Sequence, residues 1–143
     1  MIEVPDLREF VRDELVPEGA TLLIRGGPDT VEKIASHAAR TARAYLLDGE
    51  PAHGVSMFAA LDDIGSASMD GLLGGRLSTY RVVHRVEAGL VRDRGFALLP
   101  TFGRPHVTLV LTPDRIDELT ELLGPAQVNP MYGVTTRRAR RRS

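Results

Sequence analysis

The chain has 143 residues, 43% of them hydrophobic and 26% charged, so it is long enough for one domain with a sizeable core and too short for two ordinary domains. No apolar run approaches the roughly 18 residues that span a bilayer, and the N-terminus lacks a basic segment followed by an apolar one; we therefore expect a cytoplasmic protein with no membrane partner. Cysteine is absent, which excludes disulfides, thiolate metal ligands and cysteine nucleophiles.

The net charge of −1 conceals a basic C-terminal segment. The last nine residues, TTRRARRRS, carry five arginines and no acid, so residues 1–134 hold thirteen basic and nineteen acidic side chains, a net charge of −6. The sequence predicts a folded domain over 1–134 and a disordered basic tail over 135–143. Clustered arginines displace counterions from phosphates, so the tail is also a candidate for binding nucleic acid. The residues concerned are Arg137, Arg138, Arg140, Arg141 and Arg142.

The first half of the chain alternates between helical spacing of apolar residues and short continuous apolar runs. The predicted elements are a helix over 5–15, a strand over Thr21–Arg25, a helix from Asp29 to about Leu47, a strand over Val55–Ala60, and a short helix capped by Ser66 and ended by Gly74 and Gly75. Asp29 and Glu32 form a capping box for the second helix, and Gly49 stops it.

The second half is richer in strands. Its predicted elements are a strand over Thr79–His84, one or two helical turns over Val86–Arg94, strands over 96–100 and 106–112, and a helix opened by Thr112 and Pro113 and closed by Gly124. In this last helix the inward-facing residues are Ile116, Leu119, Leu122 and Leu123. The pattern predicts a single compact α+β domain with about five strands.

Several familiar motifs are missing. Gly26 and Gly27 follow a strand and precede a helix, where glycines let backbone N–H groups approach a phosphate, but neither GxGxxG nor GxxxxGK[ST] is present. HExxH and histidine pairs at i and i+4 are absent, so no metal site is expected. Ser56 stands in GVSMF rather than GxSxG, which does not favour a serine hydrolase.

His106 begins an apolar strand, and Thr108 projects from the same face two residues later. Two such H-x-[ST] strands facing each other would form the acid/base pair of a 2H-type phosphodiesterase. The candidate partner is His53, but the following hydroxyl, on Ser56, is one residue too far along and points to the opposite face. Alternatively, His106 is a hydrogen-bonded core histidine at a strand end.

The strand TLLIR ends on a fixed positive charge, Arg25. One interpretation is that Arg25 is simply the first solvated residue after the strand. The other is that it lies at the mouth of a site for an anion, because a guanidinium makes bidentate, permanently charged contacts to a diphosphate.

The segments LLIRGG, HGVSMFAALD and RPHVTLVL together resemble ADP-ribosyltransferase-like toxins, of the kind found among type VI secretion effectors and toxin–antitoxin toxins. Those toxins pair a strand ending in arginine with a GxSVF-like strand and a later HYT-like strand. The resemblance covers 21–111 and implies an ADP-ribosyltransferase-like fold, NAD as substrate, and a cognate antitoxin or immunity protein. The residues it implies are Arg25, Ser56 and His106 for catalysis, and Arg25, Gly26, Ser56 and Tyr80 for binding NAD.

The sequence departs from that family in lacking a glutamate on the late strand. Transferases of the arginine-serine-glutamate type place a glutamate on the late strand, whereas RPHVTLVL contains none, and the nearest acid, Glu87, falls in a predicted helix. Either a histidine takes over part of that role, or the NAD chemistry is weak or lost. The competing hypothesis is a non-catalytic RNA- or protein-binding module that uses Arg25, Arg81 and the arginine tail.

Overall fold

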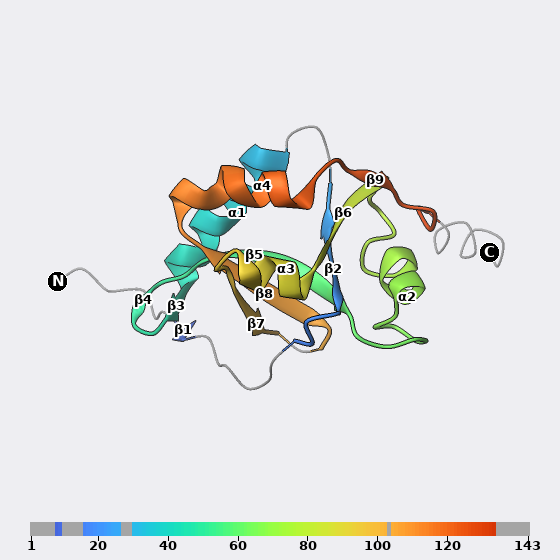
Figure 1. Ribbon diagram of the computed structural model, residues 1–143, viewed down its shortest axis with the longest axis horizontal. Helices are drawn as coiled ribbons and strands as arrows, with labels where there is room; N and C mark the ends of the chain where they lie inside the picture. Colours follow the sequence, from blue (N-terminus) through green and yellow to red (C-terminus); the bar gives the residue numbers. More distant parts are fainter. Residues whose placement is uncertain (1–7, 10–15, 27–29, 103, 134–143) are drawn as a thin grey trace.

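Six antiparallel strands form the main sheet in the part of the chain that the structure describes, residues 8–9, 16–26, 30–102 and 104–133 of a computed structural model (Figure 1). Their order is β7-β8-β5-β2-β6-β9. Their bounds are β2 Thr21–Arg25, β5 His53–Ala60, β6 Val82–Glu87, β7 Ala97–Pro100, β8 His106–Leu111 and β9 Gln127–Val128. A smaller sheet joins β1 (Arg8–Glu9), β3 (Tyr45–Leu47) and β4 (Glu50–Pro51).

Helices complete a single α+β domain. Their bounds are α1 Thr30–Ala44, α2 Met69–Gly74, α3 Ala88–Asp93 and α4 Ile116–Leu123, the last preceded by a 3₁₀ turn over Pro113–Arg115. No helix among these described residues is long and apolar enough to cross a membrane.

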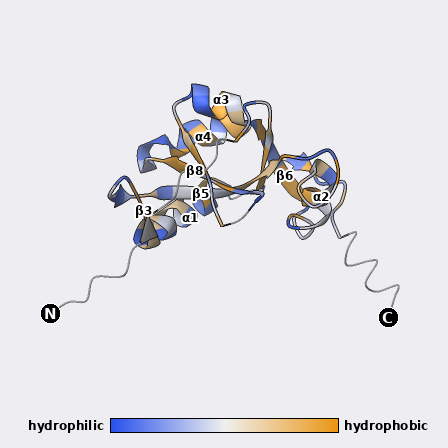
Figure 2. Cartoon of the chain, turned by 90° about the horizontal axis from the view of Figure 1, so that it is seen from below, coloured by the Kyte–Doolittle hydropathy of each residue, from blue (hydrophilic) through white to orange (hydrophobic). Residues whose placement is uncertain are grey.

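The two faces of the main sheet bury different sets of side chains. On one face, Leu22, Met57 and Leu109 are fully buried in a core shared with α1, α3 and α4. On the other, Leu23 and Val83 pack against α2 in a second cluster. Figure 2 shows the apolar colouring concentrated along the strands and on the inner sides of the helices. The alternation of side chains along each strand therefore separates two cores.

The ladder between β2 and β5 is short. It pairs Thr21 with Ala60, Leu22 with Ala59 and Leu23 with Phe58, and then stops, although β2 continues to pair with β6 as far as Arg25. Among the described residues, the first half of β5 therefore pairs with β8 on one side, whereas only the last three residues of β5 pair with β2 on the other.

Helix α1 packs against this first half of β5. Ile34 and Ala38 enter the core on one face of the sheet, while His37 hydrogen-bonds Ser56, which lies on the opposite face from that core. The close approach depends on Gly54, because a Cβ there would stand 2.5 Å from Thr108 Cγ2 and 3.0 Å from Thr41 Cγ2. The absence of a side chain at this position thus lets α1 lie beside the strand.

A buried asparagine attaches the C-terminal segment to the connection between α2 and β6. The Asn129 Nδ2 group donates to the carbonyl oxygens of Leu73, Leu77 and Tyr80 at 3.1, 2.9 and 3.1 Å, and its Oδ1 accepts from the Met131 N–H at 2.9 Å. Only 2% of Asn129 is exposed. The two N–H groups of its amide are therefore shared among three backbone carbonyls that water would otherwise have to reach.

Most predicted strands and the last helix are confirmed. Thr21–Arg25 has the predicted bounds, and β5 begins two residues earlier than predicted. Helix α4 ends at Leu123 with Gly124 as its C-cap, and its residues Ile116 and Leu119 are buried. The helical turns predicted over 86–94 occur as α3, trimmed at both ends. The strand predicted over Thr79–His84 lies three residues later, because pairing with β2 runs from Val83 to Glu87.

Three helix predictions are wrong in part. Residues Arg8 and Glu9, placed in a helix from the sequence, form a short strand that pairs in parallel with Tyr45 and Leu46. The helix predicted to reach Leu47 ends at Ala44, because 45–47 form β3. Asp48 and Gly49, with φ of 52° and 82°, then turn the chain back into β4.

The third correction concerns the cap of α2. The N-cap is Ser68 rather than Ser66: its Oγ accepts from the Gly71 N–H at 3.0 Å and donates to the Gly65 carbonyl at 2.7 Å. This bond satisfies one of the free N–H groups of the first helical turn. The predicted capping residue Asp29 and the basic tail over 135–143 lie outside the described residues.

Replacing Asn129 by alanine should lower the free energy of unfolding by about 2–4 kcal/mol, because it leaves buried carbonyl groups without their donor. Urea denaturation measures the loss, and Gln127→Ala, at a nearby exposed residue, is the matched control. Equal stability of the two variants would contradict the role given to Asn129.

Gly54→Ala should lower the free energy of unfolding by about 1–3 kcal/mol, because the new methyl group overlaps the Thr108 side chain. Rotating Thr108 away would break its 2.7 Å hydrogen bond to Thr101. Thermal or urea unfolding measures this loss of stability. Gly19→Ala is the control, since nothing lies within 4 Å of a Cβ there. A Gly54→Ala protein as stable as this control would show that α1 has room to move.

Candidate functional site

A cavity of about 370 Å³ lies where β2 and β5 are no longer paired. Its lining includes Ile24 and Arg25 from the end of β2 and Val55 and Ser56 from β5, which are on either side of that opening. The remaining lining residues are Gly26, Lys33, Ile34, His37, Arg40, Phe58, Arg76, Leu77 and Tyr80. The volume is within the range of small-molecule sites.

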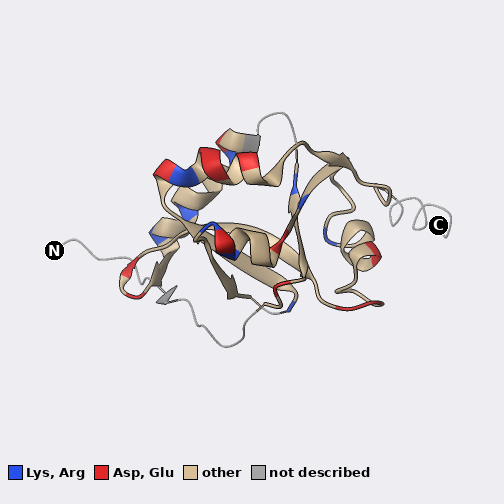
Figure 3. Ribbon diagram, viewed as in Figure 1, with Lys and Arg blue, Asp and Glu red and all other residues tan. Residues whose placement is uncertain are grey.

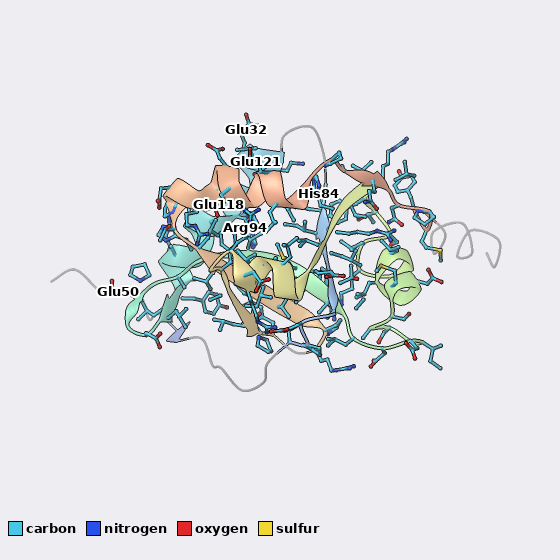
Figure 4. The ribbon with its side chains drawn as sticks, viewed as in Figure 1. Glu32, Glu50, His84, Arg94, Glu118 and Glu121 are labelled. Carbon is cyan, nitrogen blue, oxygen red and sulfur yellow. The ribbon has the colours of Figure 1, made fainter. Side chains whose placement is uncertain are left out.

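Four cationic side chains line the cavity: Arg25 from β2, Lys33 and Arg40 from α1, and Arg76 from the segment after α2. None of the described lining residues is Asp or Glu. Figure 3 shows acidic colouring on α2, α3 and α4 and in the turn between β3 and β4, and in Figure 4 the labelled Glu32 and Glu121 project away from the sheet. The cavity is therefore a positively charged site in a domain whose acids lie elsewhere, an arrangement that attracts anions.

Ring faces border the same cavity. The Arg76 guanidinium carbon lies 5.6 Å from the centroid of the Phe58 ring, within the range of a cation–π contact, and Tyr80 is a further lining residue. Because a flat ring and a guanidinium lie next to each other here, the site can accept a ligand that combines a heterocycle with an anion.

His37 and Ser56 form the polar centre of the cavity. His37 Nε2 lies 3.0 Å from Ser56 Oγ, and Arg40 Nη2 lies 3.5 Å from His37 Nδ1. Burial, with the charges of Arg40 and Arg25, lowers the pKa of His37 below its usual 6.5. The neutral form of His37 therefore predominates at pH 7.

His106 lies behind the cavity lining. Its ring meets the Phe58 ring edge-on at 5.4 Å between centroids, and its Nδ1 is 2.9 Å from Thr101 Oγ1, which is itself 2.7 Å from Thr108 Oγ1. Burial, partly opposed by a hydrogen bond with the Thr101 backbone, lowers the pKa of His106; the charge of Arg76, and that of His37 when it is protonated, act in the same direction as burial.

Four of the residues singled out from the sequence line this one cavity: Arg25, Gly26, Ser56 and Tyr80. His106 does not line it and is separated from it by Phe58. The five tail arginines lie outside the described residues.

Sequence reasoning missed the contribution of α1. Lys33, His37 and Arg40 are spaced at i, i+4 and i+7, so they share one side of the helix. This polar stripe, next to the apolar positions Ile34 and Ala38, was a usable signal for a helix that faces both a core and a site. Arg76 follows two glycines, and no pattern in the sequence connects it to Arg25.

The geometry does not support the phosphodiesterase alternative. His53 pairs with Leu111 and His106 pairs with Phe58 in the β5–β8 ladder, so the two histidines project from opposite faces of the sheet. Among the described residues, no group of three or more His, Asp or Glu side chains is arranged to hold a metal ion.

No protein-family model, curated protein or solved structure gives a significant match to this chain. The cavity and the motifs that contribute residues to it are therefore the features of the chain that bear on its function.

Stability should fall as the pH is lowered from about 7.5 to about 5.5. The pKa values of His37, His84 and His106 are all lowered from 6.5 in the folded protein, mainly by burial, so the unfolded chain binds more protons below that pH. The stabilisation is complete above pH 6.5 and is lost as the pH falls toward the folded values.

Urea unfolding at several pH values measures this dependence, and His106→Gln should flatten it. Asp62, Asp114 and Glu118 stay ionised over this pH range, because hydrogen bonds lower their pKa values. A stability that is constant over the range would contradict the burial of neutral histidines.

Proposed function

We propose that this protein is a bacterial toxin of the ADP-ribosyltransferase-like type that binds NAD in the cavity and acts on an intracellular target. The single observation that carries the proposal is the cavity between β2 and β5, lined by Arg25, Lys33, Arg40 and Arg76 around Ser56, with no acid in its described lining. The motifs LLIRGG and HGVSMFAALD, on which the family resemblance depends, supply residues from both sides of it.

The residues present suit the parts of NAD. Arginine side chains make charge-assisted, bidentate contacts with a diphosphate, which Arg25 and Arg40 would provide. Ser56 would hydrogen-bond a ribose hydroxyl or a phosphate oxygen, and Tyr80 or Phe58 would contact a base. The net charge of the ligand is negative, so binding would also relieve the mutual repulsion of the four cations.

In the transfer reaction, the bond between ribose C1′ and the nicotinamide nitrogen breaks and nicotinamide leaves with the bonding electrons. A nucleophile of the target forms the new bond to C1′ and releases its proton to solvent. The chain would fix the diphosphate and ribose so that C1′ faces the target. His106, the candidate to assist in place of the missing glutamate, lies behind Phe58, so the Phe58 side chain would have to move for the imidazole to reach the ribose.

A second candidate is a binding module without catalysis. The observation in its favour is the lack of a carboxylate among the described lining residues, since a carboxylate orients the ribose in arginine-serine-glutamate transferases. Such a module would hold a nucleotide or the terminal phosphate of an RNA and act by occlusion. For either function we propose neutralisation by a cognate antitoxin or immunity protein.

Expression of the chain in a bacterium without a partner should arrest growth, and Arg25→Ala should relieve the arrest. Losing a charge-assisted contact of this kind should weaken NAD binding by about 10- to 100-fold. Arg43→Ala is the matched control, because Arg43 is exposed in the last turn of α1 and does not line the cavity.

Measuring released nicotinamide with purified protein and a cell extract distinguishes the two functions. Release that depends on Arg25 supports the transferase, whereas growth arrest that depends on Arg25 without any release supports the binding module. Equal toxicity of the wild type and Arg25→Ala would show that the cavity is not the site of action.

A further inference from the structure

The hydrogen bonds of His37 determine which way the Ser56 hydroxyl points. A guanidinium has only donors, so the 3.5 Å contact between Arg40 Nη2 and His37 Nδ1 favours the tautomer of the neutral ring in which Nδ1 is the acceptor. In that tautomer the ring hydrogen lies on Nε2, which donates to Ser56 Oγ at 3.0 Å. The Ser56 O–H is therefore free to donate into the cavity rather than to the histidine.

This is the reverse of the arrangement in which a histidine removes a proton from a nucleophilic serine. That arrangement needs the ring hydrogen on Nδ1, held by an acceptor such as a carboxylate. Here the group at Nδ1 is Arg40, which cannot accept. Ser56 is consequently a donor for a ligand oxygen, and His37 is the residue that positions it.

Every charged group facing His37 from the described elements is cationic or becomes cationic on protonation. In the absence of an anion these groups disfavour a charge on the ring, whereas an anion among them would favour it. They are Lys33 and Arg40 on α1, Arg25 at the end of β2, Arg76 after α2, and His106 on β8 behind Phe58; Tyr80 and Ser56 are the neutral polar neighbours.

We propose that His37 couples ligand binding in this cavity to the uptake of a proton. The neutral ring positions Ser56 to donate to the ligand; when a diphosphate enters among the four cations, His37 takes a proton from solvent on Nδ1 and keeps its Nε2 bond to Ser56. The new Nδ1–H displaces Arg40, whose exposed side chain then turns to the diphosphate. This inference depends on the proposed function in one respect, namely that the cavity receives a diphosphate.

Titration calorimetry with ADP-ribose from about pH 5.5 to about pH 8.5 tests the coupling, because the diphosphate of this probe is fully ionised throughout the range and histidine is the side chain that titrates there. Wild-type affinity should rise by at least about threefold toward low pH. Repeating the titrations in buffers of different ionisation enthalpy should show uptake of up to one proton.

Two variants of His37 separate its role in positioning Ser56 from its uptake of a proton. His37→Ala should weaken binding at every pH and remove the pH dependence. His37→Gln should recover much of the affinity at high pH, because its amide N–H can donate to Ser56, but not the rise at low pH. His53→Gln, on the opposite face of the sheet, should behave like the wild type in both respects. Thermal melts confirm that each variant is folded.

The outcomes distinguish this inference from the proposed function. A pH dependence that persists in His37→Gln would overturn the inference and assign the proton to another group, with His106 the first to test, while leaving the cavity as the site. Binding of ADP-ribose that is unaffected by Arg25→Ala, or no binding at any pH, would overturn the proposed function and this inference with it.

Discussion

The early end of the ladder between β2 and β5 is the constraint on which the rest of the molecule depends. Beyond Leu23 and Phe58 the two strands no longer pair, and helix α1 packs beside the first half of β5. The glycine at position 54 makes this contact close enough, and the same opening holds the cavity. A sheet paired over its full length would leave no room for the site.

The net charge of the domain and the charge of its cavity have opposite signs. The acidic side chains give residues 1–134 a net negative charge, yet cations from three separate parts of the chain converge on the cavity. Bringing like charges together opposes folding, and burial there also disfavours protonation of His37. Sites that bind anions commonly carry such unfavourable interactions, which the ligand relieves.

The connection between α2 and β6 forms one wall of the cavity but has little regular structure of its own. Asn129, near the C-terminal end of the described chain, bonds three carbonyls around it and holds Leu77 and Tyr80 in place. A distant, buried amide therefore fixes the geometry of residues that face the ligand. A loop held in this way can present side chains rigidly, as a binding site requires.

The sequence by itself determined the α+β class, the bounds of β2 and the last helix with its buried face, because apolar periodicity and local turn signals act over a few residues. Arg25 and Ser56, which the family resemblance singled out, both line the cavity. It missed the hairpin at Asp48-Gly49, although that dipeptide is a local signal. Only the tertiary structure brought Lys33, His37, Arg40 and Arg76 to Arg25 and left His106 behind Phe58. These neighbours follow from where a strand ladder stops and how closely a helix packs, which depend on side chains far apart in the chain.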